Sequence, residues 1–245
     1  MAKVQLFVTC LVDSFAPDVG EAVVDVLERH GCTVEFPFDQ TCCGQPAFNV
    51  GYHDQAKAMA EHTIRLLDAT EGTIVVPSGS CADMMINHSP ELLAEDDALL
   101  AAAHRVAARV REFSSFLVDD LGITDARAAC HGKSAVYHPS CHGFRNLGIR
   151  SQPESLLDAV AGLERLELPD AENCCGFGGL FSVEMPDVSA AMMSTKLTNV
   201  ETSGANLLVG IDVSCLMHLE GGLRRRGSEI EVKHLAQVLN EEPAP

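Results

Sequence analysis

The sequence of 245 residues has no tryptophan, only two tyrosines, and only 17 basic residues against 35 acidic ones. Its formal net charge of −18 argues against binding to nucleic acids or to anionic membrane surfaces, because both carry charge of the same sign. No segment approaches the roughly 20 apolar residues that a membrane span needs. The start, MAKVQLFVTC, also lacks the basic and long apolar segments of a signal peptide. We therefore expect a cytoplasmic protein with no nucleic-acid partner and no membrane span.

Cysteine, in contrast, is abundant, with ten residues in the chain. In a reducing compartment, so many cysteines are more often metal ligands or redox groups than disulfides. Eight of them form two copies of one pattern, a single cysteine, a Cys-Cys-Gly motif and a further single cysteine. The first copy contains Cys10, Cys42, Cys43 and Cys81, and the second contains Cys141, Cys174, Cys175 and Cys215.

The spacing within the two copies is nearly the same. The step from the first cysteine to the pair is 32 and 33 residues, and the step from the pair to the last cysteine is 38 and 40. The copies are offset by 131 residues at the first cysteine (141 − 10) and by 134 at the last (215 − 81). Such a match indicates an internal duplication.

The segments between the cysteines repeat as well, alternating short apolar runs with amphipathic helical patterns. Helical spacing of apolar residues is found in residues 19–31 and 56–67, and the second half repeats this order with helices predicted around 154–162 and from about 187 to 201. Short apolar runs typical of buried strands precede or follow these helices, at 4–9, 32–38, 72–77, 134–139, 163–169 and 206–213. Alternation of this kind predicts right-handed βαβ crossovers and parallel sheets.

We therefore expect an α/β protein of two tandem Rossmann-like lobes with parallel sheets, related by internal duplication and a pseudo-twofold axis. The expected domains are residues 1–125 and 126–245. An apolar stripe over residues 103–117 predicts a helix that links the lobes, and residues 216–245 continue the second lobe as helix, short strand and helix.

Each patterned cysteine lies at the carboxyl end of a predicted strand or in the loop before a helix. In parallel α/β sheets these ends meet at one edge, so the four thiols of a lobe are expected to face one another. Helix N-termini nearby lower thiol pKa values. Gly44 and Gly176, directly after the pairs, permit a positive φ that turns both sulfurs inward.

Three kinds of site fit four such thiols. Structural zinc normally uses C-x-x-C knuckles, and adjacent cysteines are awkward ligands for one tetrahedral ion. Adjacent thiolates suit a multi-iron cluster better, and four of them complete the ligands of a [4Fe-4S] cluster. Zinc remains the second possibility, and dithiol–disulfide chemistry is the third.

Other residues near the pattern have weaker signals. Cys32 and Cys130 have no counterpart in the repeat and are expected to be small buried thiols. His138, His142 and His218 lie within a few residues of Cys141 or Cys215, so they are candidates for donors to sulfur or for proton carriers. For two of these three, a place at a helix end is the simpler interpretation.

The two CCG motifs with their flanking cysteines resemble the CCG cysteine-rich domain family, which includes a subunit of heterodisulfide reductase and the iron–sulfur subunit of glycolate oxidase. Within this family the resemblance is closest to proteins of this length from L-lactate oxidation systems, and it extends over essentially the whole chain. It is carried by the stretches LFVTCLVDSFAPDVGEAVVDVLERHGC, CCGQPAFNVGY, PSGSC, NCCGFGGLFSVEM and CLMHL.

The resemblance implies cytosolic oxidation of L-lactate to pyruvate without a nicotinamide cofactor. It implies that the chain is an iron–sulfur electron-transfer subunit beside two partners, a ferredoxin-like iron–sulfur protein and a third subunit without such clusters. It also implies that the eight patterned cysteines ligate one iron–sulfur cluster, of the [4Fe-4S] type, in each lobe. A zinc-bound non-catalytic scaffold and a thiol–disulfide reductase subunit are the alternatives.

Two positions depart from the family pattern. In the heterodisulfide reductase branch the last cysteine belongs to a C-x-x-C motif, which provides a fifth thiolate. Ser78 and Asp212 stand at those places here, which favours a four-thiolate cluster, or an incomplete one in either lobe. The chain also has no motif typical of a flavin or nicotinamide site, so lactate is expected to be oxidised on a partner or directly at a cluster.

Overall fold

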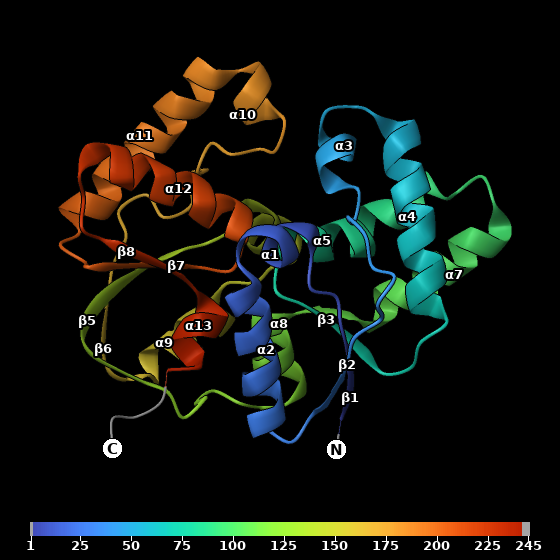
Figure 1. The fold of residues 1–245 in the computed structure, drawn as a ribbon, viewed down its shortest axis with the longest axis horizontal. Coiled ribbons are helices and arrows are strands. Elements are labelled where there is room, and N and C mark those ends of the chain that lie inside the picture. The colour runs from blue at the N-terminus through green and yellow to red at the C-terminus, as the bar shows by residue number, and fades with distance from the viewer. Residues whose placement is uncertain (1, 242–245) are drawn as a thin grey trace.

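Each half of the chain builds a four-stranded parallel sheet (Figure 1). The structure is a computed structural model and describes residues 2–241. The first sheet has the order β2-β1-β3-β4, with β1 (Lys3–Leu6), β2 (Thr33–Glu35), β3 (Thr73–Val76) and β4 (Val110–Glu112). The second has the order β6-β5-β7-β8, with β5 (Ala129–His138), β6 (Ala161–Leu166), β7 (Leu207–Gly210) and β8 (Glu231–His234). The predicted α/β class and the parallel sheets are confirmed.

The strand register shows the duplication residue by residue. Val4 lies opposite Thr73 in the first sheet, and Ala135 lies opposite Leu207 in the second. These pairs are offset by 131 (135 − 4) and 134 (207 − 73), the same offsets that separate the flanking cysteines. Positions in the two lobes can therefore be equated through the sheets as well as through the cysteines.

Helices connect the strands and cover the sheets. The first lobe contains α1 (Cys10–Phe15), α2 (Pro17–Arg29), α3 (Gln45–Asn49), α4 (His53–Asp68), α5 (Gly79–Asp83), the π-helical turn η1 (Met84–His88), α6 (Ser89–Leu92), α7 (Asp97–Arg109), α8 (Phe113–Ser115) and the π-helical turn η2 (Phe116–Asp120). The second contains the π-helical turn η3 (His142–Asn146), α9 (Ser151–Asp158), α10 (Phe181–Glu184), α11 (Pro186–Thr202), α12 (Val213–Arg226) and α13 (Leu235–Leu239). The predicted helices are found as α2, α4, α9 and α11.

The prediction of one helix over residues 103–117 is wrong. Helix α7 ends at Arg109, and residues 110–112 form β4, which extends the first sheet by pairing with β3. Val110 and Phe113 are both fully buried, one from the strand and one from the helix after it, so their spacing imitates a helical stripe. Because β4 corresponds to β8, this segment completes the first repeat instead of only linking the lobes.

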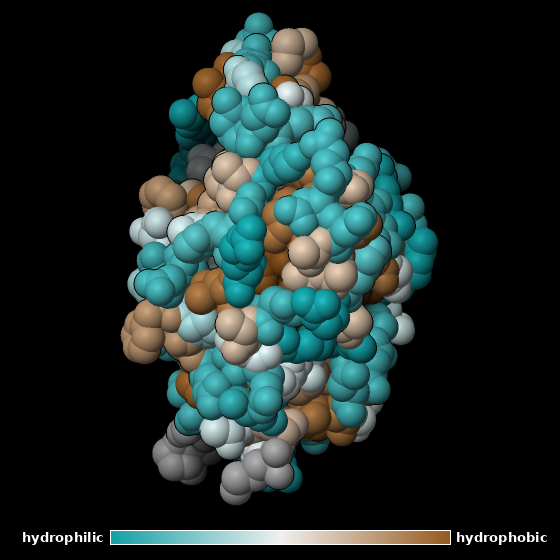
Figure 2. Space-filling view, turned by 90° about the vertical axis from the view of Figure 1, so that its right-hand side faces the viewer, coloured by the Kyte–Doolittle hydropathy of each residue, from teal (hydrophilic) through white to brown (hydrophobic). Residues whose placement is uncertain are grey.

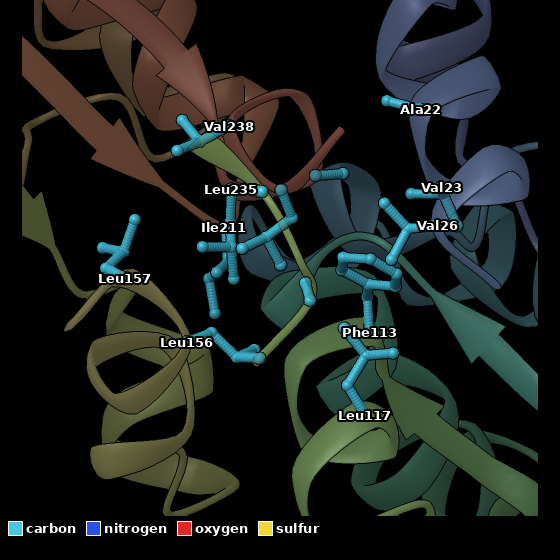
Figure 3. Packing of buried hydrophobic residues seen from close by; sticks show 14 of the residues in the cluster. Ala22, Val23, Val26, Phe113, Leu117, Leu156, Leu157, Ile211, Leu235 and Val238 are labelled. Atoms are coloured by element: carbon cyan, nitrogen blue, oxygen red, sulfur yellow. The ribbon is translucent and has the colours of Figure 1, made fainter. Parts of the chain in front are cut away.

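One hydrophobic core crosses from the first lobe to the second (Figure 3). It joins Val23 and Val26 of α2 and Phe113 of α8 to Leu156 of α9 and Leu235 of α13. The guanidinium of Arg29 also donates to the carbonyl of Leu239 (3.0 Å) and to Oδ1 of Asn240 (2.6 Å). The two lobes are therefore packed together, and their division at residues 125 and 126 stays a prediction.

Exposed hydrophobic residues are unevenly distributed over the surface. Among the residues described, no helix has both the length and the apolar character required to cross a bilayer. The face on the side of α4 and α7 is mainly hydrophilic, with hydrophobic residues in small groups (Figure 2). Exposed large hydrophobic residues gather beside α10 and α11, at Leu180, Val183, Met185 and Val188.

Candidate metal centre

In the first lobe, the four patterned cysteines meet at the carboxyl edge of the sheet. Cys10 begins α1 after β1, Cys42 and Cys43 lie in the loop between β2 and α3, and Cys81 lies in α5 after β3. The Sγ atoms of Cys10 and Cys42 are 3.6 Å apart, and those of Cys43 and Cys81 are 3.2 Å apart. All four are free thiols. The adjacent cysteines thus face different partners.

The second lobe repeats this arrangement. Cys141 directly precedes η3, Cys174 and Cys175 lie in the loop between β6 and α10, and Cys215 lies in the first turn of α12. The sulfurs of Cys175 and Cys215 lie within 4.8 Å of each other, and the thiol of Cys141 neighbours that of Cys174. The backbone N–H of Gly176 also donates to Cys174 Sγ at 3.3 Å. All four are free thiols here too.

The glycines after the two pairs have the predicted positive φ, 92° at Gly44 and 91° at Gly176. Neighbouring backbone atoms also leave little room for a side chain at these two positions. A Cβ on Gly176 would lie 2.5 Å from the carbonyl oxygen of Ser189, and one on Gly44 would lie 3.1 Å from that of Ala56. The loop can therefore pack against the following helix only with glycine at these positions.

Thr9, directly before Cys10, has φ 73° and ψ 148°, a conformation that β-branched residues rarely adopt. Its side chain accepts a hydrogen bond from the backbone N–H of Val12 at 3.5 Å, at the start of α1. Backbone strain of this kind costs on the order of 1–3 kcal/mol and concentrates at functional sites. Here it places Cys10 at the beginning of the helix, facing Cys42.

Interactions among the thiols lower the pKa of one cysteine in each lobe and raise the pKa values of its neighbours. The thiol of Cys10 donates to Cys42, and this hydrogen bond, together with the neighbouring thiol of Cys43, lowers the pKa of Cys42 to about 3. In the second lobe the pKa of Cys174 is lowered to about 2, again by hydrogen bonds from its neighbouring thiols. The donating thiols have raised pKa values, because each hydrogen-bonds to a neighbouring cysteine and is removed from water: Cys10, Cys43, Cys141 and Cys175.

Each group of four therefore forms one thiolate readily but opposes further ionisation. A bound cation removes this opposition, because its charge offsets the repulsion among thiolates and displaces their protons. The donor set is soft sulfur, which selects zinc or iron–sulfur clusters over hard cations such as magnesium. The residues present thus fit a metal ion or a metal cluster in each lobe.

A buried carboxylate joins the two lobes beside the thiols. Asp212, which is 2 % exposed, accepts hydrogen bonds from the hydroxyls of Ser78 (2.6 Å) and Ser80 (2.8 Å), and from the backbone N–H of Ser80 (3.2 Å). The hydroxyl of Ser140 also donates to it. Ser78 and Asp212, the two positions singled out in the sequence, therefore bond to each other. Ser80 and Ser140 were not predicted from the sequence, although each directly precedes a patterned cysteine.

A cavity of about 260 Å³ lies between the lobes, and both cysteine groups face it. Asp212 and Ser78 also line it, as do Pro46 and Gly179 from the loops of opposite lobes. Six of the eight patterned cysteines contribute to its wall: Cys10, Cys81, Cys141, Cys174, Cys175 and Cys215. The duplication thus places two thiol groups around one shared space.

The two cysteines outside the repeat and the candidate histidines lie in different surroundings. Cys32 and Cys130 are buried in the core shared by both lobes, as predicted. His142 Nε2 lies 3.4 Å from Nε2 of Gln45, and His218 Nε2 lies 3.4 Å from the Ser189 hydroxyl.

His138 does not lie at a helix end. It is the last residue of β5 and is 1 % exposed. Burial lowers the pKa of its imidazole to about 3, so the ring is neutral at pH 7. One ring nitrogen and the sulfurs of Cys175 and Cys215 all lie within 4.8 Å of one another.

Comparison with known proteins identifies the family of the chain. The family model of the CCG cysteine-rich domain matches residues 4–86 and 135–220, one match in each lobe. Lactate utilization protein A of Shouchella clausii is 50 % identical over 238 residues, covering 97 % of this chain and 98 % of that protein. Lactate utilization protein A of an Exiguobacterium species is 48 % identical over 242 residues, covering 98 % of both chains.

A solved structure of a hypothetical protein from Helicobacter pylori has a similar fold. Its TM-score is 0.70 at 10 % sequence identity, and the match covers 97 % of this chain but 48 % of that one. At this identity the likeness concerns the fold alone. The two domain matches and the near-complete alignments identify the family: the chain belongs to the CCG cysteine-rich domain proteins, in the group of lactate utilization protein A.

Proposed function

We propose that this chain is the iron–sulfur electron-transfer subunit of a cytosolic, nicotinamide-independent system that oxidises L-lactate to pyruvate. The relatives named lactate utilization protein A supply the link to lactate. The observation that carries the redox role is the pair of matching four-thiol groups around one cavity. A scaffold would need metal sites for stability alone, whereas each lobe already has a hydrophobic core.

Each thiol group is proposed to hold one [4Fe-4S] cluster. Cys42 faces Cys10 while its neighbour Cys43 faces Cys81, so adjacent thiolates point toward different partners. This divergence suits a cluster, in which each thiolate binds a different iron, better than a single tetrahedral ion. When bound, such a cluster supplies one-electron transfer.

The chain's own residues would hold these groups and shield them from water. Cys43 and Cys175 are each 2 % exposed, so one side of each site is closed by protein. Two one-electron sites match the two electrons that lactate releases, together with two protons, when it becomes pyruvate. The partners proposed are the ferredoxin-like iron–sulfur protein and the third subunit, and the charge of −18 favours a basic docking surface on the one that exchanges electrons.

Metal analysis of protein purified without oxygen tests this proposal. We expect brown protein with broad absorption at about 400 nm and about eight irons per chain, with matching sulfide. Colourless protein with one or two zinc ions would instead support the non-catalytic scaffold. Turnover of a thiol–disulfide substrate by metal-free protein would support the reductase alternative. The redox role itself is tested by mixing the complete three-protein system with L-lactate and following bleaching of the absorption.

A further inference from the structure

The duplication allows the surroundings of the two thiol groups to be compared position by position. Leu6 lies opposite Val75 in the first sheet, as Tyr137 lies opposite Val209 in the second, so the residues that follow, Phe7 and His138, are equivalent. Phe7 is fully buried in an apolar cluster that also contains Cys43 and Cys81. The second lobe therefore places an imidazole where the first has a phenyl ring.

This imidazole is not satisfied by the protein. Within residues 2–241, neither ring nitrogen of His138 has a hydrogen-bond partner, although the residue is 1 % exposed. A buried polar group without a partner destabilises the folded protein. A phenyl ring at the same place, as in the first lobe, avoids that cost. The imidazole thus points to a ligand that supplies the missing interaction.

Two thiols lie close enough to His138 to share a metal with it. One ring nitrogen of His138 lies within 4.8 Å of the sulfurs of Cys175 and Cys215, and the two sulfurs also lie within 4.8 Å of each other. Neutral imidazole nitrogen is among the commonest protein ligands for zinc and iron. His142, which does line the cavity, lies beside Gln45 instead.

We propose that His138 is a direct metal ligand in the second lobe, so that the two lobes hold chemically different metal groups. The first group has thiolate ligands only, and the second has thiolates and one imidazole. The inference rests on the metal binding in the proposed function. Replacing or supplementing thiolate with neutral imidazole raises the reduction potential of an iron–sulfur group. Electrons that enter the chain are thus drawn toward the second lobe.

Pulsed EPR tests this assignment. The protein is produced with ¹⁵N-labelled histidine, purified without oxygen and measured in the reduced state. Three variants carry the residue of the first lobe at the equivalent position: His138→Phe, after Phe7, His142→Leu, after Leu11, and His218→Met, after Met84. We expect the strong ¹⁵N hyperfine coupling of a directly bound nitrogen in the unsubstituted protein and in the last two variants. The coupling should vanish in His138→Phe, and the potential of the second group should fall there.

The outcomes separate this inference from the proposed function. Iron present with only weak ¹⁵N coupling, or with strong coupling that survives in His138→Phe, overturns the ligand assignment and leaves the cluster proposal intact. If the metal is zinc, the cluster proposal fails, and zinc X-ray absorption of the same samples decides about His138. A nitrogen ligand to zinc that is present in the unsubstituted protein and absent from His138→Phe supports the assignment. Zinc ligands that are all sulfur in the unsubstituted protein contradict it. Absence of metal from the second lobe overturns both.

Discussion

The hydroxyl of Ser78 donates a hydrogen bond to the carboxylate of Asp212 at 2.6 Å, and this bond connects the two lobes. These residues occupy equivalent places in the repeat, each three positions before the last patterned cysteine. The duplication has therefore brought two copies of one position into contact and given them complementary chemistry. Together with Ser80 and Ser140, they form a polar junction beside the thiols.

Removal of the Asp212 carboxylate should loosen this junction. Asp212→Ala leaves three hydroxyls and one backbone N–H without their shared acceptor, so we expect the free energy of unfolding to fall by roughly 2–4 kcal/mol. Asp212→Asn, which keeps one oxygen, should cost less. Urea denaturation measures both, with exposed Asp39→Ala as a control expected to change stability by less than about 0.5 kcal/mol. A loss for Asp212→Ala no larger than that of the control would contradict the junction.

Close backbone packing between the lobes predicts that Gly79→Ala is destabilising. A Cβ at Gly79 would lie 2.9 Å from both the Cα and the N of Gly143 in the other lobe, and backbone cannot move away as a flexible side chain can. We expect a loss of about 1–3 kcal/mol in thermal or urea unfolding. Gly221→Ala in α12, which meets no atom within 4 Å, is the matched control and should stabilise by about 0.5–1 kcal/mol.

The buried side chain of Glu112 should make stability depend on pH. Burial raises its pKa from 4.5 to about 7, although hydrogen bonds from Ser114 and Ser115 partly oppose this. Between about pH 4.5 and pH 7 the folded state retains a proton that the unfolded state has released. This contribution to stability is therefore present in full below that window and declines as the pH rises through it, by about 3 kcal/mol in total.

Glu112→Gln keeps an acceptor for the two backbone N–H groups but cannot ionise. We expect the variant to lack this decline and to exceed the unsubstituted protein in stability at pH 8 by up to about 3 kcal/mol. Urea titrations between about pH 5 and pH 8 measure the difference, with exposed Glu71→Gln as the control. A constant difference between Glu112→Gln and the unsubstituted protein at every pH would show that Glu112 titrates normally.

Loss of one thiolate should empty one lobe and spare the other. Under the proposed function, Cys42→Ser and Cys174→Ser should each reduce the iron content from about eight to about four per chain. Cys32→Ser, which alters a thiol of the shared core, should retain all the iron. Iron analysis of anaerobic samples measures this outcome. Full iron in either ligand variant would argue against the corresponding thiol group.

The second lobe also contains a buried cation, whereas residues 2–125 of the first lobe contain no buried lysine or arginine. The ammonium of Lys196 donates to the carbonyls of Asp170 (3.0 Å) and Ala171 (2.8 Å), close enough to the second thiol group to interact electrostatically with Cys174. Positive charge stabilises the reduced, more negative state of a metal group. Lys196→Met should therefore lower the reduction potential of the second group alone, as measured by redox titration. Lys57→Met, at a partly exposed lysine of the first lobe, should leave both potentials unchanged. A potential of the second group that is unaltered in Lys196→Met would contradict the effect.

Much of the fold could be predicted from the sequence, because its signals are local and repeated. The offsets of 131 and 134 between the cysteines reappear in the strand pairing, and helices α2 and α4 follow the spacing of their apolar residues. Strand β4 could not be predicted, since a buried strand followed by a buried helix gave the same apolar spacing as one long helix. Periodicity alone does not distinguish these cases over three residues.

For the site, the sequence by itself determined which thiols belong together, because the carboxyl ends of parallel strands must share an edge. Only the tertiary structure decided that both thiol groups face one cavity, that Asp212 bonds to serines of both lobes, and that His138 has no protein partner among residues 2–241. These relationships depend on how the lobes pack and on what surrounds each side chain. Such surroundings arise from residues far apart in the chain, and no local pattern of spacing or hydrophobicity encodes them.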